Sequence, residues 1–135
     1  AATKALKAAK LAEFVAAADK LLLPLNIGTE MNKDGLPFVD DLDCPALRPY
    51  RSTFLQGAQV MVGHSILLQY AGFSYIGPAA QAEFGTDVTA KNRFFAAVGA
   101  LPPLTRPPAE ALLARGADKA LDCIRDSVKQ GVWKP

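Results

Sequence analysis

The stretch that decides the fold runs from Arg51 to Glu83 and reads RSTFLQGAQVMVGHSILLQYAGFSYIGPAAQAE. No charged residue lies between its two ends, over about thirty positions, whereas a helix needs roughly 20 apolar residues to cross the hydrocarbon of a bilayer. Lipid cannot satisfy the polar groups of this stretch, so in a membrane they must face protein, a cofactor or water. These polar side chains are Gln56, Gln59, His64 and Gln69. The stretch predicts one transmembrane helix over about residues 52–76.

Helical spacing places the only histidine of the chain on a stripe of small and apolar side chains. Small residues around His64 leave room for a close helix approach or for a flat ligand. The alternative is the central helix of a soluble bundle, with His64 hydrogen-bonded in its core. The missing charges favour the membrane helix. The stripe consists of Gly57, Met61, His64, Leu68, Ala71 and Tyr75.

Before this stretch the chain divides into two segments. Residues 1–24 are rich in alanine and lysine and predict an amphipathic helix that ends at Pro24. Its basic first half fits an anionic membrane surface or a solvated face equally well. Residues 25–51 hold glycines, prolines and the acids Asp40, Asp41 and Asp43, which predicts an extended arm with a solvated acidic turn. The opening residues are typical of the end left after a targeting peptide is removed.

After the stretch, residues 79–108 are predicted to form a loop. The apolar piece at 94–104 is too short to span a bilayer and is broken by Pro102-Pro103, so we expect it to rest on a surface or a partner. Residues 109–131 alternate apolar and charged positions at helical spacing and predict an amphipathic helix. The predicted fold is mainly α, a single membrane-associated subunit over 1–135 with a membrane segment at 52–78, amphipathic terminal helices and long irregular arms.

Composition and motifs exclude several classes of function. The net charge of +2 is dispersed, whereas nucleic-acid binding needs a clustered basic face. With one histidine, no nucleophile elbow and no glycine-rich phosphate loop, the chain offers no catalytic constellation, and we predict that it is not an enzyme. A single imidazole in a membrane helix can serve as the axial ligand of a metal macrocycle. Haem and the magnesium of chlorophyll are the candidates for His64.

Short motifs resemble the photosystem I reaction-centre subunit L family over about residues 34–90. They are Asp34-Gly35-Leu36-Pro37-Phe38-Val39, Leu42, Cys44-Pro45, Tyr50-Arg51, Gly77-Pro78 and Thr86-Asp87-Val88. Within the predicted helix, Gly57, Gln59 and His64 follow the spacing of that family's glycine, glutamate and histidine, with glutamine in place of the glutamate. The glutamate and histidine contact chlorophylls in that family, so the resemblance implies cofactor-binding roles for Gln59 and His64. A weaker resemblance, through Gln56-Gly57, Met61 and Gly63, links the stretch to the first helix of light-harvesting chlorophyll proteins.

These resemblances imply an accessory structural and pigment-binding subunit of a photosynthetic membrane supercomplex, either photosystem I or its antenna. His64 would bind the chlorophyll magnesium, Gln59 would assist, and carotenoid and lipid are further candidate ligands. The partners would be larger membrane subunits and lipids. Arg48 and Arg51 predict that the amino terminus lies on the cytoplasm-equivalent side, which the resemblance implies is the stromal side of the chloroplast thylakoid membrane. The alternatives are a peripheral accessory subunit of a mitochondrial inner-membrane complex, such as ATP synthase or a respiratory enzyme, and a soluble helical interaction module.

Overall fold

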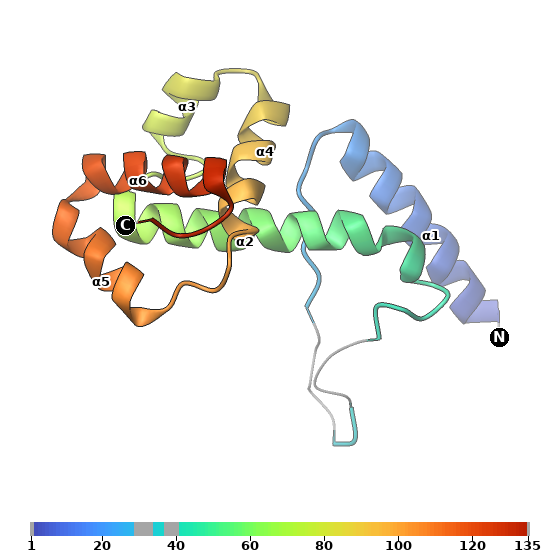
Figure 1. Ribbon diagram of the computed structural model, residues 1–135. Coiled ribbons are helices and arrows are strands. Elements are labelled where there is room, and N and C mark those ends of the chain that lie inside the picture. Colours follow the sequence, from blue (N-terminus) through green and yellow to red (C-terminus); the bar gives the residue numbers. More distant parts are fainter. Residues whose placement is uncertain (1, 29–33, 37–40, 135) are drawn as a thin grey trace. The chain divides into compact units, whose positions relative to one another are not determined.

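The computed structural model describes residues 2–28, 34–36 and 41–134, and these residues form helices and turns without a strand (Figure 1). The chain divides into two compact units. Unit one covers residues 1–57, and unit two covers residues 58–135. Helix α2, Arg51–Ala71, begins in unit one and continues into unit two. The mainly helical class predicted from the sequence is therefore correct.

Unit one contains α1, Ala2–Lys20, a 3-10 helix η1, Arg48–Tyr50, and the first turns of α2. Its buried side chains are Val15, Ala18 and Phe54, while most of α1 is exposed, including the apolar side chain of Phe14. The predicted arm at 25–51 has turns between residues 41 and 47 that lead into η1.

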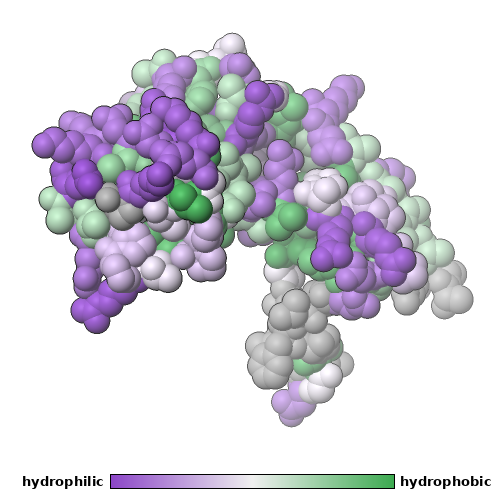
Figure 2. Space-filling view, viewed as in Figure 1, coloured by the Kyte–Doolittle hydropathy of each residue, from purple (hydrophilic) through white to green (hydrophobic). Residues whose placement is uncertain are grey.

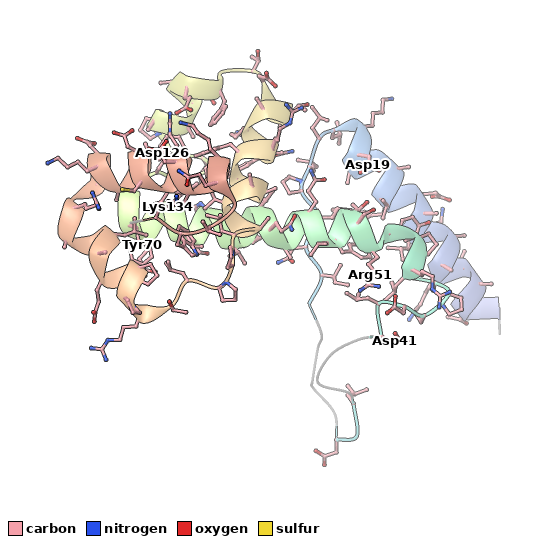
Figure 3. All side chains as sticks on the ribbon, viewed as in Figure 1. Asp19, Asp41, Arg51, Tyr70, Asp126 and Lys134 are labelled. Carbon is pink, nitrogen blue, oxygen red and sulfur yellow. The ribbon has the colours of Figure 1, made fainter. Side chains whose placement is uncertain are left out.

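The predicted acidic turn is held by local contacts (Figure 3). The Asp41 carboxylate accepts a hydrogen bond from the backbone N–H of Asp43, and the Asp43 carboxylate forms an ion pair with Arg51 at 2.8 Å. Asp40 lies outside the described residues, as do Pro37, Phe38 and Val39 of the resemblance. Because both partners of the ion pair are well exposed, it contributes about 1 kcal/mol or less.

Unit two buries one aromatic and aliphatic core among the second part of α2 and four further helices. These are α3, Pro78–Phe84, α4, Val88–Gly99, α5, Arg106–Arg115, and α6, Ala117–Gln130. Phe95 of α4 is fully buried at the centre, with Phe73 stacked on it at 5.9 Å between ring centroids. The remaining core side chains include Val60, Leu67, Val98, Leu112, Ala120 and Ile124.

The predicted loop over 79–108 is wrong, because α3 and α4 occupy much of it. Pro78 stands in the first turn of α3, where its missing N–H costs nothing. Asp87 caps α4, since its side chain accepts a hydrogen bond from the Ala90 backbone N–H at 2.9 Å. The apolar piece that we expected on a surface instead supplies the buried residues Phe95 and Val98.

The predicted transmembrane helix over 52–76 is also wrong. Helix α2 ends at Ala71, where Gly72 adopts a left-handed conformation with φ of +62°. Among the described residues, no helix combines the length and the apolar character that a membrane crossing requires. The reason is that freedom from charge is not the same as apolarity: serine, threonine, glutamine and histidine dilute the apolar residues of α2.

The predicted helix over 109–131 is divided at Gly116, whose φ is +78°, into α5 and α6. After α6 the chain folds back on unit two. The indole Nε1 of Trp133 donates to the Pro102 carbonyl at 2.7 Å, and the buried hydroxyl of Ser127 accepts from the Lys134 backbone N–H at 2.9 Å. The tail is thereby fastened to its own unit.

Candidate functional site

The part of α2 in unit two presents two different sides. Its inner side packs against α4, which crosses it in Figure 1. A Cβ built on Gly63 would overlap the Phe95 carbonyl oxygen and lie 3.1 Å from the Gly99 backbone nitrogen. A Cβ on Gly99 would in turn overlap the Gln59 carbonyl oxygen. The two backbones therefore touch, and only glycine fits at either position.

His64 lies half-buried at the edge of this inner side. Its Nδ1 accepts a hydrogen bond from the Tyr75 backbone N–H at 3.2 Å, and its ring is tilted over Phe95 at 6.4 Å. A neutral imidazole has one donor and one acceptor nitrogen, so this bond places the proton on Nε2. Neither nitrogen then offers a free lone pair to a metal. The chlorophyll-ligand role of His64 stays a prediction, and it requires the bond from Tyr75 to break.

The Tyr75 side chain extends the contacts around His64. Its hydroxyl donates to the Asn92 side-chain oxygen, its ring meets Phe95 edge-on at 5.0 Å, and Lys91 Nζ lies 4.3 Å from the ring centre. Burial raises the pKa of the Tyr75 phenol above its ordinary value of 10.0. The phenol is therefore neutral at physiological pH, and it joins the segment after α2 to α4.

Gln59 and His64 do not come together. Five helical positions rotate a side chain by about 140° from its starting direction, so the two residues point to different sides of α2. Gln59 is half-buried, and its backbone carbonyl is at the crossing with α4. Within the described residues, no three His, Cys, Asp or Glu side chains gather into a group that could hold a metal ion. The cofactor role of Gln59 stays a prediction.

The other side of α2 is exposed except at the half-buried Ala58, and it carries no charge. We define the α2 outer face as Ala58, Met61, Val62, Ser65, Leu68 and Gln69, all in unit two. Met61 and Val62 are each 49% exposed and Leu68 is 48% exposed. The Ser65 hydroxyl donates to the Met61 carbonyl at 3.0 Å, so it is satisfied within the helix.

The sequence stripe predicted around His64 contains part of this face. The structure exposes Met61 and Leu68, whereas Ala71 and Tyr75 of the same stripe are half-buried with His64. The stripe therefore follows the border between the two sides of α2. Val62 and Ser65 were missed, because the spacing of residues within one helix does not show which side is exposed.

Comparison with protein-family models, curated proteins and solved structures finds no match. The resemblance to the photosystem I subunit L family therefore rests on the short motifs alone. Of those motifs, Asp34, Gly35 and Leu36 are exposed. Gly77-Pro78 and Asp87 begin the helices α3 and α4, so in this chain they have a structural explanation of their own.

Proposed function

We propose that this chain is an accessory, non-catalytic subunit that attaches to a larger assembly through the α2 outer face. The observation that carries the proposal is an exposed helix side with three half-exposed apolar residues and no charge. Contiguous exposed apolar surface commonly marks a contact with another molecule, whereas single exposed apolar residues are ordinary. Ser65 lies three or four positions from each of Met61, Val62 and Leu68, so these three apolar side chains border the same serine on one side of the helix.

The same unit supplies an internal comparison. Helix α6 is also partly exposed, and hydrophilic residues gather over it in Figure 2. Its buried residues Ala120 and Ile124 point to the core, while most of its exposed positions are charged, namely Asp118, Lys119, Asp122, Asp126 and Lys129. This is the pattern expected of a helix side that faces water. The α2 outer face is different, because its exposed positions are uncharged and partly apolar, and this difference supports contact with another molecule.

A rough energy indicates what this face can contribute. Full burial of a valine, leucine or methionine side chain is worth about 1.5–3 kcal/mol, so burying the remaining half of three such residues gives about 3 kcal/mol. A matching partner surface adds a similar amount. Association itself costs about 4–15 kcal/mol. The α2 outer face therefore suits a subunit that joins an assembly with further contacts, and a pair held by this face alone would be weak.

Photosystem I or its antenna, at the thylakoid membrane, is the assembly that we propose from the motif resemblance. The pigment role is a separate proposal, because docking through the α2 outer face needs no chlorophyll. A mitochondrial inner-membrane complex is the second setting. The absorbance spectrum of the assembly that co-purifies with the chain distinguishes the two.

The docking proposal is tested with a matched pair of leucine variants of the full chain, carrying an amino-terminal tag, in the cells that produce it. Leu68→Lys places a charge on the α2 outer face, while Leu113→Lys makes the same change at an exposed leucine of α5. We expect the unaltered chain and Leu113→Lys to migrate with a large assembly on a density gradient. Leu68→Lys should migrate as the free tagged chain, which is 14.3 kDa without its tag, with unchanged circular dichroism. Retention of Leu68→Lys in the assembly would refute the proposal.

A further inference from the structure

We propose that the hydrogen bond between His64 and Tyr75 is a pH-sensitive latch, which holds the segment between α2 and α3 while the imidazole is neutral and releases it when the imidazole is protonated. We define this connecting segment as residues 72–77, which follow the end of α2 and precede Pro78 of α3. All of these residues belong to unit two. The proposal concerns the inner side of α2, so it is independent of docking through the α2 outer face.

The connecting segment turns back along α2. Gly72, with φ of +62°, reverses the chain after the helix. The Phe73 backbone N–H then donates to the Leu67 carbonyl at 3.1 Å, and the Tyr75 backbone N–H donates to His64 Nδ1 at 3.2 Å. The acceptors lie progressively earlier in α2 as the segment advances. Two hydrogen bonds therefore fasten the segment at two successive points of the helix.

The acceptors of these two bonds differ in chemistry. The Leu67 carbonyl does not titrate, whereas His64 Nδ1 accepts a hydrogen bond only while it carries no proton. A protonated imidazole has two N–H donors and no acceptor, so turning the ring over does not restore the bond. His64 would then point an N–H at the Tyr75 N–H. Protonation therefore removes the second point of attachment and leaves the first unchanged.

The charges around the latch also favour its opening in acid. Among the described residues His64 forms no ion pair, so a positive imidazole would have no carboxylate partner. Helix α4 brings Lys91, whose Nζ lies 4.3 Å from the centre of the Tyr75 ring, and the uncharged ring of Phe95. The Tyr75 phenol is neutral, as described above. A second cation beside Lys91 therefore adds repulsion without a compensating attraction.

The release is confined to the second half of the connecting segment. Phe73 is buried and stacked on Phe95, so the first half stays in the core. Ile76 is already 88% exposed, so its displacement removes no large apolar surface from the core. An imidazole gains its second proton between about pH 5 and 8. Because the closed latch needs the neutral ring, its contribution is present at the upper end of this range and is lost as the pH falls.

The test measures backbone amide hydrogen exchange by NMR in the isotope-labelled full chain at about pH 8 and about pH 5. Each rate is divided by the rate of an unstructured peptide at the same pH. We expect the protection of the Tyr75 amide to fall about fivefold or more in acid, which is the loss of one ordinary hydrogen bond. The Phe73 amide is the internal control and should keep its protection. His64 is the only histidine of the chain, so its ring resonances report its charge directly.

Two matched variants separate the acceptor from the titration. His64→Asn places an amide oxygen, which accepts a hydrogen bond but does not titrate, where Nδ1 stands. Its Tyr75 amide should be protected equally at both pH values. His64→Phe keeps a ring of similar shape without an acceptor, so its Tyr75 amide should be unprotected at both pH values.

Four results would overturn the proposal. The Tyr75 amide could keep its protection while the His64 ring becomes charged, or the ring could stay neutral at about pH 5. Phe73 could lose its protection together with Tyr75, which would indicate acid unfolding of unit two as a whole. Loss of Tyr75 protection in acid in His64→Asn would assign the response to another group.

Discussion

Replacing Gly63 by alanine adds one methyl group at the point where α2 and α4 touch. In an open helical position this change would stabilise the chain by about 1 kcal/mol, because alanine is the better helix former. At Gly63 the new Cβ would overlap the Phe95 carbonyl oxygen and lie 2.9 Å from the Phe95 carbonyl carbon. Carbon atoms in contact normally lie about 3.5–4.0 Å apart, so the helices must separate by about 1 Å.

This separation loosens the core on both sides of the contact. A gap of about 0.5–1 Å forfeits a quarter to a half of the dispersion attraction between facing atoms. Phe95 and Val98 on α4 and Leu67 on α2 are all fully buried, so they lose contacts together. Overpacking costs about 1–3 kcal/mol and more where backbone must move. After subtracting the gain in helix propensity, we expect Gly63→Ala to lower the free energy of unfolding by about 2 kcal/mol.

The assay is chemical unfolding followed by circular dichroism at 222 nm. Ser65→Ala is the matched control, because it lies on the same helix at an exposed position, and its effect should stay within about 0.5 kcal/mol. An unfolding midpoint for Gly63→Ala equal to or above that of the unaltered chain would refute the close backbone contact. Gly99→Ala should be destabilising for the same reason, since its Cβ would overlap the Gln59 carbonyl oxygen.

Three further predictions concern the remainder of unit two. Asp87→Ala removes the cap of α4 and should cost about 1 kcal/mol in the same unfolding assay; an unchanged midpoint would argue against the bond to Ala90. Because burial raises the pKa of Tyr75, the native state holds the phenolic proton more tightly than the unfolded chain does. That contribution is complete below the ordinary pKa of 10.0 and is lost as pH rises through the folded value, so stability should fall less steeply above pH 10.0 in Tyr75→Phe. His64→Leu leaves the Tyr75 N–H without its acceptor and should cost about 1–3 kcal/mol. Loss of one pigment from the purified assembly of that variant would support the ligand role, and an unchanged pigment count would exclude it.

The sequence predicted the helical class and much of the C-terminal helical region, because apolar residues recur there at helical spacing. The predicted membrane helix was wrong, because we gave the absence of charge between Arg51 and Glu83 more weight than the presence of glutamines and a histidine. Helices α3 and α4 were missed although Pro78 and Asp87 are both starting signals. The predicted loop was too long, because we let Pro102-Pro103 count against a helix in the residues before them.

The candidate site depended on knowing which side of α2 is buried, and the sequence of one helix does not contain that information. Met61, His64 and Leu68 share a stripe at helical spacing, but α4 decides that the histidine lies at the inner edge and the other two face outward. The close contact at Gly63 could not be predicted from the sequence either, because a glycine permits a close approach without indicating which backbone makes it.

The tail after α6 gives the molecule an optical probe of its own. Trp133 is the only tryptophan of the chain, and its indole is half-buried and bonded to Pro102. Its fluorescence spectrum therefore reports on unit two alone, while far-ultraviolet dichroism sums the helices of both units. Recording the two signals in one titration separates the melting of unit one from that of unit two without any label.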